Sequence, residues 1–287
     1  MTVRPLITIK NLLTLLALIP AQIVITAHAQ TETEIIETVS DLIAHCHNAP
    51  LQTAKAISIN QEAEVILDDG RHLKFADIFF PRTSTGSQIP KETIQFLKSH
   101  LNNKKIAFLA SEKPDRYRRT PAQIIVNHMD GSKKWSQSHI LKSGKALFMP
   151  EPQKRARKDF CDSDGLKRSL QQHEKQNTSH KNTHPFAPVY ASDNKVLWQL
   201  EGNFAIIEGV VLKTHSSKNN IFLNFGVEWK SDFTAVVTAD SKELLLKHFE
   251  SISNLIGKRL KLRGFIDIYN GPSMRIDHPL QIEILHE

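Results

Sequence analysis

The sequence predicts a mainly β protein with some α-helix, of the α+β class, built from two small closed β-barrels. Three observations predict this fold. Short runs of alternating apolar and polar residues, bounded by Gly, Asn and Asp, recur in both halves of the chain. One amphipathic helix interrupts the strands of each half. Removing a 29-residue N-terminal segment from the 287 residues leaves 258, enough for two domains of about 100 to 150 residues each.

Residues 1–29 predict a signal peptide. Arg4 and Lys10 precede the apolar run "NLLTLLALIPAQIVITA", and "AHA", a small-x-small cleavage site, ends at Ala29. The alternative is an uncleaved membrane anchor, against which Pro20 and Gln22 count because they interrupt a short run. We therefore expect an exported protein, periplasmic or secreted, with no stable membrane span after cleavage. Removal of the signal peptide with Arg4 and Lys10 lowers the formal net charge from +7 to +5, and this remaining positive charge favours acidic partners. The oligomeric state stays open.

Residues 30–50 form the predicted N-terminal helical segment. Apolar residues recur at helical spacing in Glu34–His45, after an acidic start. Cys46 and Cys161 would share an oxidising compartment, and the sequence leaves open whether they form a disulfide. His45, Cys46 and His47 are direct neighbours, which seldom converge on one ion, so we expect no metal site there.

Residues 51–182 form the predicted first barrel. Two strands flank the tight-turn dipeptide Asp69-Gly70, and an amphipathic helix follows in residues 91–103. The basic turn "DRYRRT" separates two further strands, and a helix in "SQSHILKSG" stops at Gly144. The polar helix "GLKRSLQQHEKQNTSH" leads to a linker at residues 183–193. Three histidines of this region are expected to be solvated, namely His173, His180 and His184.

Residues 194–287 form the predicted second barrel. The runs "FAIIEGVVLKTHSS" and "NNIFLNFG" predict paired strands, and "FTAVVTA" predicts a third. A helix capped by Ser241 comes next, followed by two closing strands. Three strands, a helix and two strands are the order of a five-stranded Greek-key barrel of the oligonucleotide/oligosaccharide-binding (OB) type. Core roles are expected for Trp135, Trp198 and Trp229, and an exposed loop contact is the alternative for Trp229.

Several of these segments resemble the thermonuclease family, the staphylococcal-nuclease-like domains. They are the hairpin "DGRHLKFADIFFP", the helix after it, "DRYRR", and "GLKRSLQQHEKQ" in the place of the closing helix. The second half resembles exported bacterial members in which an OB-like module follows that domain. The resemblance implies a staphylococcal-nuclease-like first barrel that cleaves nucleic-acid phosphodiesters, with calcium held by carboxylates and the phosphate held by two arginines.

The carboxylates that the family's chemistry needs are replaced in this sequence. The first metal aspartate falls near Ala63, and the second becomes Phe79 or Phe80. The glutamate that should follow Pro81 is Arg82. We therefore expect no metal or other cofactor, although the family would imply calcium.

The phosphate-binding arginines are partly retained. Lys74 stands in the place of the first and keeps its charge but not its bidentate fork, whereas Arg119 matches the second directly. Arg118 replaces the usual glycine.

These replacements predict a degenerate nuclease that binds nucleic acid or another polyanion without cleaving it. Cations that follow a backbone and aromatic rings that stack on bases achieve such binding. In the first barrel the candidates are Lys74, Arg82, Arg116, Tyr117 and Arg118, with Arg119 as the one catalytic match to the family. In the second barrel they are Lys258, Arg259, Lys261, Arg263, Tyr269 and Arg275. Phe79 and Phe80 either join the first set or belong to the core.

Two alternatives remain open. Neighbouring carboxylates can support a rewired metal site and an active nuclease; they are Glu62, Glu64, Asp68, Asp69 and Asp77. Against this, Asp68 and Asp69 suit the hairpin turn, and strand alternation turns Asp77 away from Lys74. The second alternative is an envelope adaptor that binds a protein or a glycan, since one fold hosts many functions.

Overall fold

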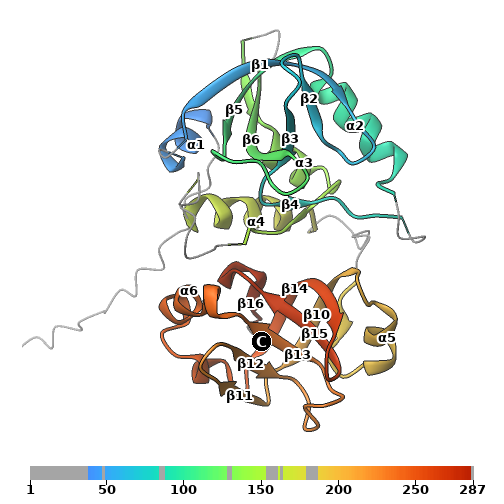
Figure 1. Cartoon of the computed structure of the whole chain (residues 1–287), viewed down its shortest axis with the longest axis vertical. Helices are drawn as coiled ribbons and strands as arrows, with labels where there is room; N and C mark the ends of the chain where they lie inside the picture. Colours follow the sequence, from blue (N-terminus) through green and yellow to red (C-terminus); the bar gives the residue numbers. More distant parts are fainter. Residues whose placement is uncertain are drawn as a thin grey trace, which may run out of the picture. The chain divides into compact units, whose positions relative to one another are not determined.

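The computed structural model describes residues 38–46, 49–83, 88–127, 131–152, 161, 164–178 and 187–285. It contains two curled β-sheets flanked by helices, which confirms the mainly β, α+β fold class (Figure 1). The predicted signal peptide, His47, His180, His184 and the start of the predicted linker lie outside the described residues.

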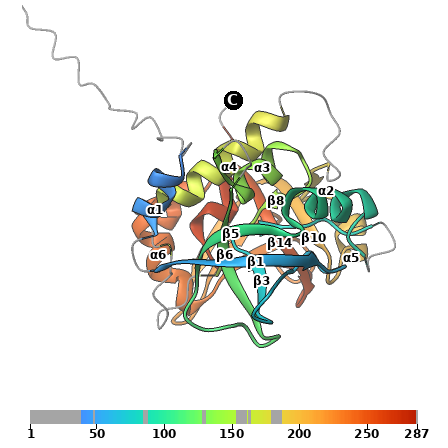
Figure 2. The same ribbon diagram turned by 90° about the horizontal axis from the view of Figure 1, so that it is seen from above.

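The first sheet closes into a ring. Its strands are β1 (Leu51–Ile59), β2 (Val65–Leu67), β3 (His72–Phe75), β5 (Lys104–Ala110), β6 (Arg119–Asn127) and β7 (Lys133–Trp135). Their order is β3-β2-β1-β5-β6-β7, and β3 also pairs in parallel with β6. The predicted hairpin is confirmed, because β2 and β3 pair antiparallel around Gly70, whose φ is 82°. Strand β1 extends from the side of α1 (Val39–His45) to the side of α2 (Lys91–Leu101) (Figure 2).

Helices and a disulfide complete this part of the chain. The remaining elements are α3 (Ser136–Lys142), α4 (Asp164–Thr178) and a short pair of strands, β4 (Ile78–Phe79) with β8 (Leu147–Phe148). The apolar face predicted for α2 is buried in the core. Helix α1 begins after its capping residue Thr38, and Cys46 at its end is bonded to Cys161. The disulfide that the sequence left open is therefore formed, and it occupies the one thiol near His45.

His173 is buried, so its predicted place on a solvated surface is wrong. It lies on the same face of helix α4 as Leu166 and Leu170, which are also buried and precede it by seven and three residues. Its ring stands edge-on to Trp135 with centroids 6.0 Å apart. Neither ring nitrogen has a hydrogen-bond partner among the described residues. The polar composition of this helix concealed a narrow apolar stripe.

The second sheet is strongly curled and follows the same strand order. Its strands are β9 (Val189–Tyr190), β10 (Phe204–Val210), β11 (Lys213–Ser216), β12 (Ile221–Asn224), β13 (Thr234–Val237), β14 (Arg259–Ile268), β15 (Pro272–Ile276) and β16 (Ile282–Ile284). The predicted first strand is broken at Val211 and Leu212, so that β10 pairs with β14 while β11 pairs with β12. Strands β13 and β15 pair in parallel, as β3 and β6 do in the first sheet. Both sheets therefore have the OB-like Greek-key order.

The helices of the second sheet include α5 (Asn194–Gln199), α6 (Ala239–Phe249) and the 3₁₀ turns η1 (Ile252–Leu255) and η2 (Pro279–Gln281). The cap predicted for α6 is wrong. Thr238 precedes the helix, and Ser241 lies within its first turn, where its hydroxyl donates to the carbonyl of Asp277 at 2.9 Å. Of the helices that the structure describes, none has both the length and the apolar character needed to cross a membrane.

Each sheet encloses its own apolar core, and a small third cluster links residues of both. Phe79 belongs to this cluster, with its ring stacked on Phe204 at a centroid distance of 4.5 Å. Of the three tryptophans, Trp135 is buried as predicted. The core prediction is wrong for Trp198 and Trp229, which are 48% and 54% exposed.

Candidate binding sites on the two barrels

Lys74 and Arg119 lie on the paired strands β3 and β6, and both are already bound to carboxylates. The Nζ of Lys74 lies 2.7 Å from Oε1 of Glu151. Arg119 places Nη2 2.7 Å from Oδ2 of Asp115 and Nε 3.8 Å from Oε1 of Glu64. The two cations that the sequence assigned to phosphate binding are thus neutralised within the protein.

The pKa values of this cluster follow from these contacts. Partial burial alone would lower the pKa of Arg119, but the hydrogen bond and charge of Asp115, with the charges of Glu64 and Glu151, raise it above its ordinary value. Partial burial alone would raise the pKa of Asp115, yet hydrogen bonds from Arg119 and from the Tyr117 N–H lower it below its ordinary value. Both groups are therefore held in their charged forms.

The turn at residues 115–119 contains four of the predicted residues, Arg116, Tyr117, Arg118 and Arg119. One Asp115 oxygen accepts from the N–H groups of Tyr117 and Arg119, at 2.8 and 3.0 Å. The Tyr117 ring is 60% exposed, and its centroid lies 4.7 Å from the Arg116 guanidinium and 4.9 Å from that of Arg119. Arg118 adopts a φ of 63°, in the left-handed region. Beside this turn lies a hollow of about 660 Å³, lined in part by His72, Tyr117 and Arg118.

Arg82 forms an ion pair of its own. Its Nη2 lies 2.7 Å from Oε2 of Glu62, with both side chains partly exposed. Of the six predicted first-barrel residues, Arg116 and Arg119 each contact the Tyr117 ring, and Arg118 lies in the same turn. Lys74 and Arg82 lie in separate ion pairs.

Every carboxylate considered for a rewired metal site has a protein donor. The donors are Arg82 for Glu62, the Asn60 side-chain amide for Glu64, the Lys55 N–H for Asp68, Arg71 for Asp69, and Gln123 with the Glu151 N–H for Asp77. The prediction that Asp77 lies on a strand is wrong. Strand β3 ends at Phe75, and Asp77 follows it with a φ of 60°. Within the described ranges, no three His, Cys, Asp or Glu side chains are grouped as metal ligands would be.

The outer face of the second barrel carries two rows of side chains that cross its strands. Pairing across β11, β12, β13 and β15 aligns one row with an apolar centre: His215, Phe222, Val236 and Arg275. The next row is polar: Lys213, Asn224, Thr234 and Ser273. The alternate residues of the same strands, such as Leu223 and Ala235, are buried in the core.

Two loops add aromatic rings to this face. The loop after β12 carries Trp229, and the loop between β14 and β15 carries Tyr269, which is 77% exposed. We call the space between these loops and the two rows the aromatic hollow. It measures about 630 Å³, and its lining residues are Leu212, Lys213, His215, Phe222, Asn224, Gly226, Val227, Trp229, Thr234, Val236, Tyr269, Asn270 and Ser273.

Two glycines hold these loops in place. A Cβ on Gly271 would lie 2.9 Å from the backbone of Ser231, so the two loops pack directly on each other. A Cβ on Gly226 would lie 2.0 Å from a carboxylate oxygen of Asp232. That carboxylate accepts from the Glu228 N–H and from Asn194, and these hydrogen bonds lower the pKa of Asp232 below its ordinary value. The loop that presents Trp229 is thus fixed by a charged group.

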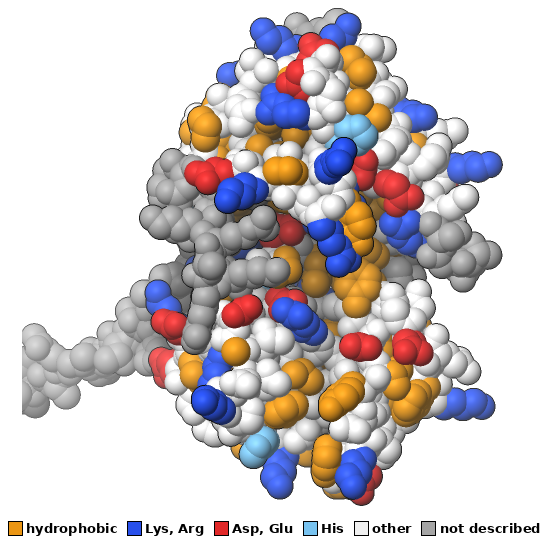
Figure 3. Space-filling model, in the orientation of Figure 1, with side chains coloured by type: hydrophobic (Ala, Val, Ile, Leu, Met, Phe, Trp, Pro, Cys, Tyr) orange, Lys and Arg blue, Asp and Glu red, His pale blue; other side chains and the backbone are white. Residues whose placement is uncertain are grey.

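The cations predicted on the second barrel are mostly engaged. Arg263 is buried against Glu174 of α4 and also lies near Glu283, so its predicted place on an exposed binding face is wrong. Arg259 and Lys261 share Glu208 at 3.2 Å each. Arg275 pairs with Asp277 at 2.6 Å. On the face shown in Figure 3, Lys and Arg are interspersed with Asp and Glu rather than gathered into one patch.

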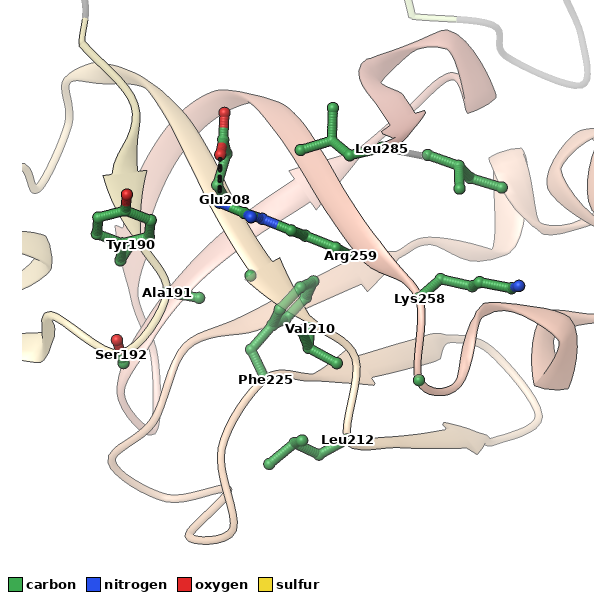
Figure 4. A pocket seen from close by; sticks show the side chains of 13 residues that line it. Tyr190, Ala191, Ser192, Glu208, Val210, Leu212, Phe225, Lys258, Arg259 and Leu285 are labelled. Carbon is green, nitrogen blue, oxygen red and sulfur yellow. Dashed lines mark hydrogen bonds and ion pairs between the residues drawn. The ribbon is translucent and has the colours of Figure 1, made fainter. Parts of the chain in front are cut away.

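A second hollow lies beside the broken first strand of this barrel, and we call it the basic hollow (Figure 4). It measures about 720 Å³. Its charged lining residues are Lys258, Arg259 and Glu208, and Tyr190, Phe225 and Leu285 also line it. Leu212 lines both this hollow and the aromatic one.

Of the three rings, Tyr269 is a candidate binding residue by sequence, whereas Phe222 has no predicted binding role and Trp229 is predicted first as a core residue. A signal for Phe222 was present: it alternates with Ile221 and Leu223, so it had to face outwards if they faced the core. No comparable pattern exists for Trp229, because it lies in a loop whose path is set by contacts distant in sequence.

No protein-family model matches this chain, and no curated protein matches it. Among solved structures, similarity is found to asparaginyl-tRNA synthetase from Pyrococcus horikoshii, with 19% identity and a TM-score of 0.26 over 34% of this chain and 22% of that one. Asparaginyl-tRNA synthetase from Entamoeba histolytica gives 15% identity and a TM-score of 0.26, over 36% and 24% of the two chains. Aspartyl-tRNA synthetase from the same organism gives 11% identity and a TM-score of 0.26, over 37% and 23%. Each match therefore spans less than a quarter of the synthetase chain.

Proposed function

We propose that this chain is an exported binding protein that holds nucleic acid or another polyanion without cleaving it. It would combine a degenerate staphylococcal-nuclease-like barrel with an OB-like barrel, as the resemblance to the thermonuclease family implies. The observation that carries the proposal is the aromatic hollow, which presents Phe222, Trp229 and Tyr269 on the outer face of a small barrel. Aromatic rings on such a face stack on bases, and nearby cations attract the backbone.

The absence of hydrolysis is inferred from the first barrel. Arg82 stands where the family's glutamate is expected and is paired with Glu62. Phe79, at one of the two positions matched to a metal aspartate, packs on Phe204. A site without its metal and its base loses a large part of the at least about 8 kcal/mol by which enzymes lower a barrier. In this proposal the protein needs no calcium and no other cofactor.

The proposed location is the periplasm or the exterior of the cell. It rests on the signal-like sequence of residues 1–29. The bond between Cys46 and Cys161 supports it, because disulfides persist in oxidising compartments.

Cleavage and retention of labelled nucleic acid test the proposal. The purified protein is incubated with single- and double-stranded DNA and RNA in calcium, magnesium, manganese or chelator, and both intact polymer and complex are measured. We expect intact polymer in all conditions and retention that weakens as salt rises, because phosphate contacts release counterions. Trp229→Ala should reduce retention, whereas Trp198→Ala, an exposed tryptophan outside the hollow, should not.

Two results would overturn the proposal. Metal-dependent cleavage that disappears in Arg119→Ala would show that the first barrel is an active nuclease. Retention of a glycan or a protein, with no retention of nucleic acid or another polyanion, would show an envelope adaptor instead.

A further inference from the structure

We propose that the aromatic hollow and the basic hollow form one continuous track for single-stranded nucleic acid, with bases in the first and backbone phosphate in the second. This inference rests on the proposed function and specifies its ligand and its path. The basic hollow is assigned as the phosphate site of the track.

The two hollows share a lining residue where the first strand of the second barrel breaks. Leu212 lines both hollows and lies in the break between β10 and β11. Its N–H donates to the carbonyl of Asn224, in the aromatic hollow, at 2.9 Å. The preceding residue, Val211, donates to the carbonyl of Lys258 at 3.1 Å and accepts from the Gly257 N–H at 2.8 Å. Val211 and Leu212, the link between β10 and β11, therefore hold one edge of each hollow in place.

The aromatic hollow suits unpaired bases. Phe222, Trp229 and Tyr269 offer ring faces on which bases can stack, a contact that does not depend on base identity. Asn224 and Asn270 add amide donors and acceptors for base edges. In a duplex the faces of the bases are stacked on one another, so that only a single strand can use these rings.

The basic hollow suits the phosphate backbone. Lys258 and Arg259 line it, and Glu208 accepts from Arg259 at 3.2 Å, an interaction drawn in Figure 4. The same carboxyl group lies 3.2 Å from Nζ of Lys261, so one carboxylate is shared between two cations. Together the residues that line the two hollows include three cations, Lys213, Lys258 and Arg259, and one carboxylate, Glu208. The charge of the track thus complements a polyanion.

A neutral glycan would also stack on aromatic rings, but it gains nothing from the cations of the basic hollow. A highly charged polyanion without bases would leave the aromatic rings unused. Of these three ligands, a single-stranded nucleic acid is the one that uses both ends of the track, which is why the observations favour it.

The length of the oligonucleotide determines whether it can occupy one hollow or both. Small barrels of this kind bind about 4 to 16 nucleotides each. The shortest oligomers should occupy the aromatic hollow alone, and longer ones should reach the basic hollow as well. A charge in the basic hollow should therefore matter only for longer oligomers.

The test measures the affinity of the full protein for fluorescent oligothymidylates of about 3 to 16 nucleotides, by anisotropy at several salt concentrations. Trp229→Ala should weaken binding at every length by about 5- to 150-fold, because stacking contributes about 1 to 3 kcal/mol per base. Lys258→Gln should leave the shortest oligomer unchanged, weaken the longer ones, and reduce their salt slope by about 0.7. The controls are Trp198→Ala and Lys195→Gln, which change exposed side chains outside both hollows.

The outcomes distinguish the track from the proposed function. If Trp229→Ala weakens binding but Lys258→Gln has the same effect at all lengths, or none at any length, the single track is wrong and the proposed function stands. If duplex binds as tightly as single strand, or a neutral oligosaccharide displaces the oligomer, the assignment of the ligand is wrong. If no oligomer and no longer nucleic acid or other polyanion binds, the proposed function itself fails.

Discussion

Arg263 offers a direct test of how the buried charges of this protein are balanced. Its side chain is 5% exposed, and that of Glu174 is 6% exposed. The Arg263 guanidinium donates to Glu174 and to the carbonyl of Phe148, the latter at 3.3 Å, and Nη2 lies 3.4 Å from Glu283. Replacing Arg263 by methionine keeps much of the volume but leaves the carboxylate of Glu174 buried without its cation.

The expected cost follows from that uncompensated charge. Removing one partner of a buried ion pair destabilises proteins by about 3 to 5 kcal/mol. In a chain of this size each kcal/mol lowers the Tm by about 2 to 4 °C, so the Tm should fall by roughly 6 to 20 °C. Replacing both partners, in Arg263→Met with Glu174→Leu, removes both charges and should recover most of the loss.

Urea unfolding of the four proteins in this cycle measures the effect, with Arg259→Met as the control on the same strand. Arg259 is 47% exposed at its side chain and pairs with Glu208, so its replacement should cost no more than about 1 kcal/mol. A smaller loss in Arg263→Met than in the Arg259→Met control would show that the buried Glu174 carboxylate does not need its cation. A loss in the double variant equal to the sum of the two single losses would show that the two side chains do not act as a pair.

Three further predictions concern other parts of the fold. Reduction of the Cys46–Cys161 bond should lower the free energy of unfolding by about 2 to 5 kcal/mol, towards the upper end because the bond joins residues 115 apart; thermal unfolding with and without reductant measures this. Burial lowers the pKa of His173 from 6.5 to about 4. The unfolded chain therefore binds a proton first, and the free energy of unfolding should fall by about 3 kcal/mol as the pH drops from 6.5 to 4. Urea unfolding should show a smaller fall in His173→Phe, and an unchanged pH dependence would contradict the assignment. Gly226→Ala should displace the loop of the aromatic hollow, because the new Cβ would lie 2.0 Å from the Asp232 carboxylate; oligonucleotide affinity should fall, and wild-type affinity would show that the loop position is unimportant.

The sequence predicted the strand order because local signals specify it. Alternating apolar residues placed Leu260 and Leu262 in the core, and Asp69-Gly70 placed the first hairpin. Helix α2 was predicted with its buried face because Leu97 and Leu101 recur at helical spacing. Each of these features depends on residues close together in the chain.

The errors arose where partners distant in sequence decide the outcome. Arg263 has the same strand context as Arg259, but it is buried against Glu174, 89 residues earlier, and Phe148, 115 residues earlier. Ser241 has the chemistry of a cap, but its hydroxyl is used by Asp277. A single sequence gives no measure of such contacts, so the candidate cations could be named but not sorted into free and paired.

The two barrels share one strand order, yet they leave different surfaces for a ligand. At the mouth of the first, Lys74 and Arg119 close on Glu151, Asp115 and Glu64, so an incoming phosphate would have to displace carboxylates that already hold these cations. None of the described residues that line the aromatic hollow of the second is acidic. A polyanion at the aromatic hollow therefore meets rings and amides without a competing carboxylate, and in the basic hollow it meets one carboxylate, Glu208, beside Lys258 and Arg259. Binding energy should accordingly reside in the second barrel even if the first resembles a nuclease, and variants at the mouth of the first should change stability more than affinity.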